Sequence, residues 1–219
     1  MKNKEQSRRK FISTSALALT GLSAFGSQGL DFLNPAQTEK VRVGLIGSGS
    51  RGLGLAQTLA NVRNIELVAC CDIVEDHLKA GLRLADKDAK GYYDYQRLID
   101  DPNVSAVIIA TPLFLHFPMA VAALKAGKHV YVEKTMAYDI PQTLHLVKLV
   151  DNSKLVFQVG HQYRYYSMYH KVKEIIDKGW IGKVYHYECQ YNRNSDWRQP
   201  VKDPATERAV NWKMYKEYC

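Results

Sequence analysis

The sequence predicts an α/β fold built on a doubly wound parallel sheet, and three observations support this fold class. From residue 41 onward, short apolar segments alternate with amphipathic ones, as strands do when helices connect them. The first apolar segment, residues 41–46, leads directly into a glycine-rich turn and then into a helical pattern. The second, residues 65–71, is followed at once by an aspartate. A parallel sheet brings such turns and acids to one edge, where ligands bind.

Five strands and their connections can be located from apolar runs and turn signals. The strands are expected near residues 41–46, 65–71, 104–110, 128–132 and 155–159. Asp101 and Pro102 mark the turn before the third strand, and Pro141 stands near the start of the helix after the fourth. The helix between the third and fourth strands ends at Gly127. Its apolar face is formed by Leu115, Met119, Ala122, Ala123 and Ala126.

A second domain is expected to begin after about residue 160. Residues 166–179 are interpreted as a helix, and residues 182–192 alternate as a strand with one covered face does. The sequence thus divides into a parallel-sheet domain over residues 41–160 and the start of another domain over residues 161–219.

The glycine-rich turn has the spacing Gly47-x-Gly49-x-x-Gly52, which indicates a dinucleotide site when it joins a strand to a helix. Gly47 would permit the tight turn, Gly49 would let the backbone approach a pyrophosphate, and Gly52 would let the helix pack close to the strand. The phosphates would lie at the helix N-terminus, where free N–H groups favour negative charge. The residues assigned here to cofactor binding are Gly47, Ser48, Gly49, Ser50, Arg51 and Gly52.

Asp72 follows the second strand, twenty positions after Gly52, and is a further cofactor-binding candidate. A carboxylate there can accept hydrogen bonds from the adenosine ribose and would repel a 2′-phosphate, which favours NAD as the cofactor. NADP remains the second choice because Arg51 lies nearby. The other interpretation is an ordinary glycine loop with an unrelated surface aspartate.

The first 26 residues resemble a twin-arginine (Tat) signal peptide. Arg8 and Arg9 precede Phe11, Ile12 and a weakly apolar stretch that is too short to span a membrane. This predicts passage through the Tat translocase and a periplasmic or exported location, with cleavage after Gly26 and a leader over residues 27–40. A disordered basic tail is the alternative.

Charge and cysteine content point away from two classes of partner. The formal net charge of +8 includes five Lys or Arg and one Glu in residues 1–26, so it falls to +4 without them. The remaining basic residues are scattered among acids, and no nucleic-acid partner is predicted. The cysteines, at 70, 71, 189 and 219, have neither zinc spacing nor a disulfide framework, and Cys189 is expected on a later strand. We therefore predict no metal.

Motifs at the later strand ends resemble a known family. The matching residues are Thr111, Pro112, His116, Ala126, Gly127, Lys128, His129, Glu133 and Lys134. In this pattern the sequence is similar, over roughly residues 41–200, to the glucose-fructose oxidoreductase, inositol dehydrogenase and rhizopine catabolism family (Gfo/Idh/MocA). Two positions depart from it: Leu113 stands where Asn is frequent, and Thr135 replaces the Pro of a Glu-Lys-Pro triplet.

The resemblance implies a Rossmann domain and assigns roles to these residues. Thr111, Pro112 and His116 would lie beside the cofactor, Glu133 would contact its nicotinamide side, and Lys134 would be the catalytic acid or base. Lys134 also follows a strand directly, at the edge where parallel sheets bind ligands. Burial beside the nicotinamide would lower its pKa and suit it to move a hydroxyl proton. The alternatives are a solvated Lys134 and a His116 that only packs.

Substrate contacts are expected just after the fifth strand. By resemblance, Gln162, Arg164 and Tyr165 would face a sugar or polyol, whose hydroxyls Arg and Gln can bind. Tyr166 and Tyr169 are at least as well explained as a helix face packed against the sheet. Trp197 and Arg198 are further pocket or subunit-contact candidates.

The resemblance also predicts an incomplete second domain. The family's mostly antiparallel second sheet supplies an Asp and a His to the active site, and neither motif occurs before Cys219. We therefore expect a truncated product or fragment with weak turnover, and a homo-oligomer when full length.

The resulting hypothesis is an NAD(P)-dependent oxidoreductase acting on a CH–OH group of a sugar or cyclitol. Because export separates the protein from free NAD, the cofactor should be tightly held and regenerated within each cycle. One alternative is a glycosidase that oxidises its substrate transiently; relatives of that kind commonly lack the Glu-Lys pair, so Lys134 favours the oxidoreductase. The other alternative is a fragment that binds nucleotide without catalysis.

Overall fold

The computed structural model describes residues 40–192 and 198–215. The predicted signal peptide, the leader up to residue 39, Trp197 and Cys219 lie outside these residues. The described part contains no helix that is long and apolar enough to cross a membrane.

One six-stranded parallel sheet forms the centre of the domain, with the strand order β3-β2-β1-β4-β5-β6. The strands are β1 (Val41–Ile46), β2 (Ile65–Cys71), β3 (Lys90–Tyr92), β4 (Ala106–Ile109), β5 (His129–Glu133) and β6 (Phe157–Gly160). All five neighbouring pairs are parallel. The five predicted strands are thus confirmed to within a few residues. β3 was not predicted, because its three residues, KGY, make no apolar run.

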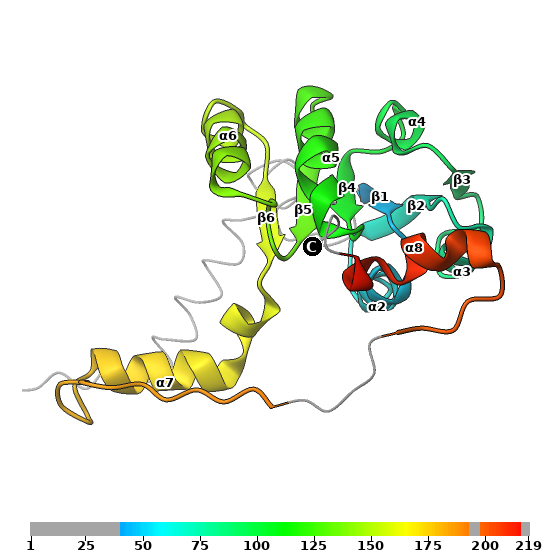
Figure 1. Cartoon of the computed structure of the whole chain (residues 1–219). Coiled ribbons are helices and arrows are strands. Elements are labelled where there is room, and N and C mark those ends of the chain that lie inside the picture. Colours follow the sequence, from blue (N-terminus) through cyan, green and yellow to red (C-terminus); the bar gives the residue numbers. More distant parts are fainter. Residues whose placement is uncertain (1–39, 193–197, 216–219) are drawn as a thin grey trace, which may run out of the picture. The chain divides into compact units, whose positions relative to one another are not determined.

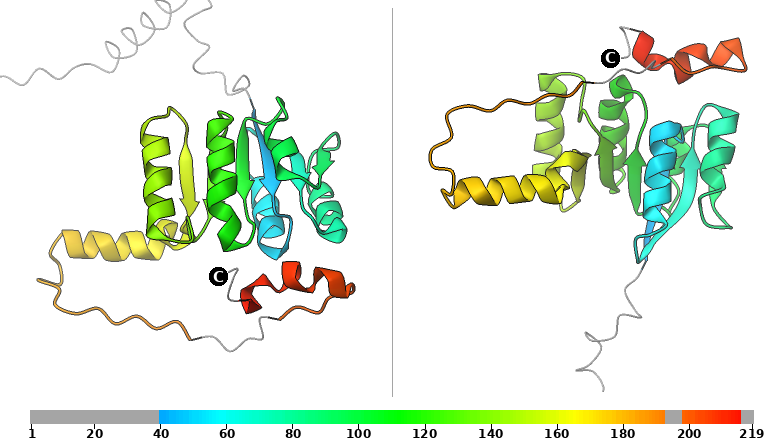
Figure 2. Two further views of the ribbon diagram at one scale, coloured as in Figure 1. Left: turned by 45° about the horizontal axis from the view of Figure 1, so that its top comes forward. Right: turned by 90° about the horizontal axis from the view of Figure 1, so that it is seen from below.

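Helices cover both faces of this sheet, as Figures 1 and 2 show. α2 (Ser50–Leu59) and α3 (Glu75–Leu82) lie on one face. α4 (Tyr95–Ile99), α5 (Leu113–Lys125) and α6 (Ile140–Asp151) lie on the other. The strand order reverses between β1 and β4, which are neighbours in the sheet although far apart in sequence. Doubly wound sheets bind ligands at such a reversal, at the carboxyl ends of the strands.

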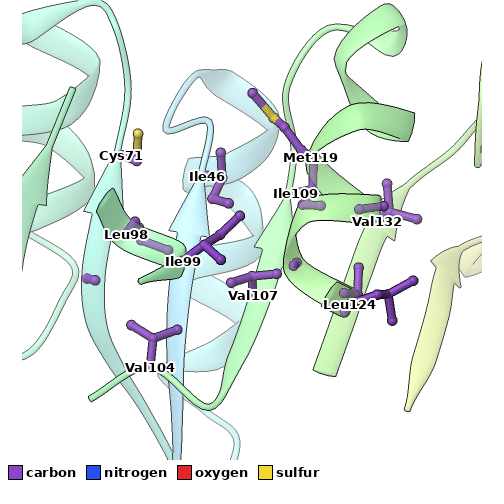
Figure 3. Close-up of a cluster of buried hydrophobic side chains, with 14 of the residues drawn as sticks. Ile46, Cys71, Leu98, Ile99, Val104, Val107, Ile109, Met119, Leu124 and Val132 are labelled. Atoms are coloured by element: carbon purple, nitrogen blue, oxygen red, sulfur yellow. The ribbon is translucent and has the colours of Figure 1, made fainter. Parts of the chain in front are cut away.

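Two apolar clusters fix the helices on the sheet. The larger joins the sheet to α4, α5 and α6, and Figure 3 shows part of it, with Ile46, Val107 and Ile109 facing Leu98 and Met119. The smaller joins the other face to Ala56 of α2 and Leu78 of α3. Burial of this apolar area is the main favourable term in folding.

Helix ends follow the local signals in the sequence. Asp139 caps α6 by accepting a hydrogen bond from the backbone N–H of Gln142, and Pro141 occupies the first turn. Gly127 has φ of +73° and directly follows the C-cap of α5, so this helix ends at the glycine as predicted. Local chemistry therefore sets where the helices that carry the site begin and end.

The region after β6 contains helices but no strand among its described residues. It includes η4 (Gln162–Tyr165), α7 (Ser167–Asp177), η5 (Pro204–Thr206), α8 (Glu207–Val210) and η6 (Trp212–Met214). The strand predicted over residues 182–192 is wrong, and Cys189 is exposed in irregular backbone. Alternation fixes which side chains share a face, but a strand also needs a partner for its N–H and C=O groups, and the described residues give it none.

α7 also differs from the expected packing. It has no buried residue, and Tyr166 and Tyr169 are half exposed instead of packed against the sheet. Their rings stack on each other with centroids 6.2 Å apart, and the Tyr163 ring lies edge-on to Tyr166. The two tyrosines therefore pack with neighbouring aromatic rings.

Candidate functional site

The carboxyl edge of the sheet brings together residues that are far apart in the sequence. The glycine loop follows β1, Asp72 follows β2, and Thr111 and Pro112 follow β4. Glu133 ends β5, Lys134 comes directly after it, and η4 with Gln162, Arg164 and Tyr165 follows β6. Since all these strands are parallel, their carboxyl ends lie at the same edge of the sheet. The predicted site residues therefore lie at this edge or in the first turns of the helices that leave it.

Gly47 and Gly52 have the steric roles expected of a dinucleotide loop. Gly47 has φ of +92°, and a Cβ there would lie 2.8 Å from the carbonyl carbon and oxygen of Ala110. A Cβ on Gly52 would lie 1.9 Å from the backbone oxygen of Gly47. The tight turn and the close approach of α2 to β1 thus both require glycine.

Gly49 leaves open space where a pyrophosphate would approach. A Cβ there would meet only the His77 ring, at 3.8 Å. Gly49 is also the N-cap of α2 and gives this helix no side-chain cap, so the first-turn N–H groups are open to an anion. The loop therefore fits the phosphates of a dinucleotide.

The side chain of Ser48 plays a different part from the loop backbone. It is fully buried, and its Oγ would lie 2.6 Å from a Cβ on Gly81 of α3. The Cys70 thiol would lie 3.3 Å from the same point, and burial raises the pKa of this thiol to about 12. Ser48 can therefore contact a cofactor only through its backbone. Its buried side chain packs against α3 and fixes the position of the loop on that helix.

Asp72 holds the loop from the end of β2. Its side chain is 9% exposed. Oδ2 accepts a hydrogen bond from the backbone N–H of Ser48 at 2.7 Å, and Oδ1 accepts one from Val74 at 2.9 Å. Each carboxylate oxygen keeps a further lone pair, so the group can still accept hydrogen bonds from a ribose. Asp72 is thus suited both to shape the loop and to bind the adenosine side of the cofactor.

Arg51 extends from the first turn of α2 to the end of β5. Its Nη2 lies 2.5 Å from Oε1 of Glu133, whose side chain is 8% exposed, and Tyr131 donates a hydrogen bond to the same oxygen at 3.3 Å. The hydrogen bond to Glu133 raises the pKa of Arg51, while burial, followed by the charge of Glu133, raises that of Tyr131. Arg51 is therefore paired at the end of β5, which β1 and β4 separate from β2 and Asp72 in the sheet, and this pairing does not favour a 2′-phosphate.

The pairing of Arg51 with Glu133 and the role of Gly160 were not predicted from the sequence. A Cβ on Gly160 of β6 would lie 2.5 Å from the Tyr131 hydroxyl and 2.8 Å from Glu133 Oε1. Glycine at this position leaves room for the cluster of Arg51, Glu133 and Tyr131. A glycine at the end of a predicted strand was the available signal.

Replacing Arg51 by Ala is expected to destabilise the fold by about 1–2 kcal/mol, because the buried Glu133 carboxylate loses its charged partner. Chemical denaturation of the two proteins measures this difference. Lys173→Ala is the matched control, since Lys173 pairs with Asp177 on an exposed surface and should change little. Equal losses in both variants would contradict a special role for the Arg51 pair.

His116 belongs to α5, the helix that follows β4, and it is buried, with 2% of its surface exposed. Its Nε2 is 3.0 Å from the Thr111 carbonyl oxygen and its Nδ1 is 2.6 Å from that of Thr135. The peptide bond between Lys134 and Thr135 is cis. His116 therefore links the end of β4 to the segment after β5 and positions the two segments. Because both ring nitrogens already contact carbonyl oxygens, the ring is neither free to bind a ligand nor held by apolar packing alone.

Lys134 is exposed in this structure, and its expected burial beside a bound nicotinamide stays a prediction. Lys134 directly follows the last residue of β5, at the carboxyl edge of the parallel sheet. Of the substrate candidates, Gln162 is half-buried, while Arg164 and Tyr165 are exposed. The structure thus leaves these groups accessible at one edge.

Fold and site together define an oxidoreductase domain of the NAD-binding Rossmann type. A family model with the description "Oxidoreductase family, NAD-binding Rossmann fold" matches residues 41–161. The chain belongs to this Gfo/Idh/MocA family. Its cofactor class is accordingly NAD, as the sequence predicted.

Curated relatives include two kinds of enzyme. Inositol 2-dehydrogenase of Salmonella typhimurium is 38% identical over 145 residues, which is 65% of this chain and 43% of that protein. A glycosyl hydrolase family 109 protein of Shewanella amazonensis is 29% identical over 225 residues, which is 91% of this chain and 49% of that protein. The chain thus spans less than half of the length of these relatives.

Solved structures show the same fold. Scyllo-inositol dehydrogenase from Lactobacillus casei with bound NAD(H) and scyllo-inositol superimposes with a TM-score of 0.62 at 27% identity, covering 66% of this chain and 43% of that one. Myo-inositol dehydrogenase from Lactobacillus casei with NAD(H) and myo-inositol gives 0.61 at 32% identity, covering 65% and 43%.

Proposed function

We propose that this protein is an NAD-dependent oxidoreductase that transfers hydride between a CH–OH carbon of a sugar or cyclitol and the bound nicotinamide. The observation that carries this proposal is the meeting of the glycine loop, Asp72, Glu133 and Lys134 at one sheet edge. NADP is disfavoured because Asp72 remains an acceptor and Arg51 is paired with Glu133. The inositol dehydrogenases among its relatives support a cyclitol or sugar as the substrate class.

The reaction divides between cofactor and protein. A bound nicotinamide would supply the acceptor for the hydride, which leaves the substrate carbon with the electron pair of the broken C–H bond. Lys134 would accept the hydroxyl proton as the C=O double bond forms, and would return it in the reverse direction. Glu133, held by Arg51 and Tyr131, would contact the nicotinamide side of the cofactor, and Gln162, Arg164 and Tyr165 would orient the substrate hydroxyls.

Export through the Tat pathway and a periplasmic location are part of the same proposal, as is a homo-oligomeric full-length protein. The twin arginines Arg8 and Arg9 support export. An exported enzyme must retain its nicotinamide and restore it in each cycle, which favours coupling one sugar oxidation to another reduction.

A glycosidase that acts by transient oxidation is the second candidate function. The observation in its favour is that the family 109 relative covers 91% of this chain, more than the inositol dehydrogenases do. Oxidation of one hydroxyl to a ketone, with hydride passing to NAD, would acidify the neighbouring C–H, and loss of that proton would expel the glycosidic oxygen. Water would then add to the resulting C=C bond, and return of the hydride to the ketone would restore the cofactor to its starting state. Such an enzyme would release nitrophenol from a nitrophenyl glycoside with no net change in NAD.

The first experiment identifies nucleotide released from the purified, denatured protein by mass spectrometry, and then follows absorbance at 340 nm after addition of inositols and sugars. An oxidoreductase should release NAD or NADH and respond to a polyol. Lys134→Met should bind NAD but lose the response. Lys154→Met, an exposed lysine before β6, should retain it. Cofactor binding with no response to any polyol or glycoside would identify a nucleotide-binding protein without catalysis.

A further inference from the structure

His77 of α3 lies between the two parts of the site that face the adenosine half of a dinucleotide. Its Nδ1 is 3.6 Å from Oδ1 of Asp72, and its ring is the nearest neighbour of the position that a Cβ on Gly49 would occupy, at 3.8 Å. The side chain is 31% exposed, so one part of the ring is open to a ligand. The ring therefore borders both the expected ribose position at Asp72 and the open pyrophosphate position at Gly49.

We propose that His77 is a further cofactor-binding residue whose protonation sets the affinity for dinucleotides and the choice between NAD and NADP. This inference rests on the proposed NAD site. The protonated ring would attract the pyrophosphate beside Gly49 and would partly neutralise Asp72, the group that repels a 2′-phosphate. The neutral ring would leave the Asp72 charge uncompensated.

The charged groups around His77 support a cationic ring. Asp72 approaches from the end of β2 and Asp76 from α3 itself, while Lys202 pairs with Asp76 at 3.6 Å. Asp72 raises the pKa of His77 and burial opposes this only in part. His77 therefore stays protonated to a higher pH than an ordinary histidine, whose pKa is about 6.5.

The sign of the pH effect follows from this charge. Below the pKa of His77 the ring is cationic and both dinucleotides gain attraction. As pH rises through that pKa the attraction is lost. The affinity for NADP should fall more than the affinity for NAD, because the 2′-phosphate of NADP would lie nearest to Asp72. Discrimination against NADP should accordingly increase with pH.

The experiment measures the Kd of NAD and of NADP by calorimetry between pH 5.5 and 8.5 for the wild-type protein, His77→Gln and His170→Gln. His170 lies exposed on α7 and is the matched control. Between pH 5.5 and 8.5, the ratio of the NADP Kd to the NAD Kd should rise about three- to tenfold more in wild type and H170Q than in H77Q. A change of this size is expected when one partly exposed charge is lost. Comparison between variants removes the titration of the 2′-phosphate itself.

Each outcome decides the inference. Identical pH profiles in wild type and H77Q would overturn the role of His77 and leave the NAD site standing, whereas no binding of either dinucleotide at any pH would overturn both. Should H77Q fail to fold, ring-proton NMR of the wild type replaces it. Addition of NADP must then raise the titration midpoint of one of the seven histidines, and no movement would refute the inference.

Discussion

Replacing Gly52 by Ala is expected to abolish NAD binding and to destabilise the domain by about 3 kcal/mol or more. The new Cβ would lie 1.9 Å from the backbone oxygen of Gly47, and 3.0 Å from its carbonyl carbon. Both atoms belong to backbone, so no side chain can move aside. α2 must shift away from the turn, which misplaces the phosphate-binding N–H groups. Calorimetric titration with NAD and chemical denaturation measure the two effects.

Gly54→Ala on the same helix is the control for this substitution. No atom lies within 4 Å of the position that its Cβ would take. Alanine there should leave NAD binding unchanged and stabilise the helix by about 0.5–1 kcal/mol. If G52A bound NAD as G54A does, the close contact between α2 and the turn would not be a requirement of the site.

Replacing Asp72 by Ala is expected to weaken NAD binding by at least about 30-fold and to cost about 2–3 kcal/mol of stability. The substitution removes the ribose acceptor and leaves the backbone N–H groups of Ser48 and Val74 without their carboxylate. Asp72→Asn keeps one acceptor oxygen and removes the charge. It should therefore retain more stability than D72A and discriminate less against NADP.

Asp101→Ala separates loss of stability from loss of the cofactor site. Asp101 is buried like Asp72 and accepts hydrogen bonds from the N–H of Asn103 and the hydroxyl of Tyr92, but it precedes β4 at the other end of that strand. D101A should lose comparable stability and bind NAD normally when folded. Equal losses of affinity in D101A and D72A would show that Asp72 acts only through stability.

The agreement between sequence and structure is closest where a signal is local. The glycine spacing, the carboxylate after β2 and the apolar runs each report a short segment, and the five longer strands and the turn at Gly47 follow from them. β3 was missed because its three residues form a strand only beside β2. The strand expected over residues 182–192 is wrong for the opposite reason. Its side chains alternate as in a strand, but no neighbouring strand among the described residues pairs with its backbone N–H and C=O groups.

By itself the sequence determined the parallel α/β domain, its dinucleotide loop and the preference for NAD, because these depend on steric and charge properties of single residues at fixed spacing. Only the tertiary structure decided that Arg51 pairs with Glu133, 82 positions away, that His116 ties Thr111 to Thr135, and that His77 borders Asp72 and Gly49. Such contacts arise when parallel strands place their ends at one edge, and no local pattern encodes which side chains then meet across it.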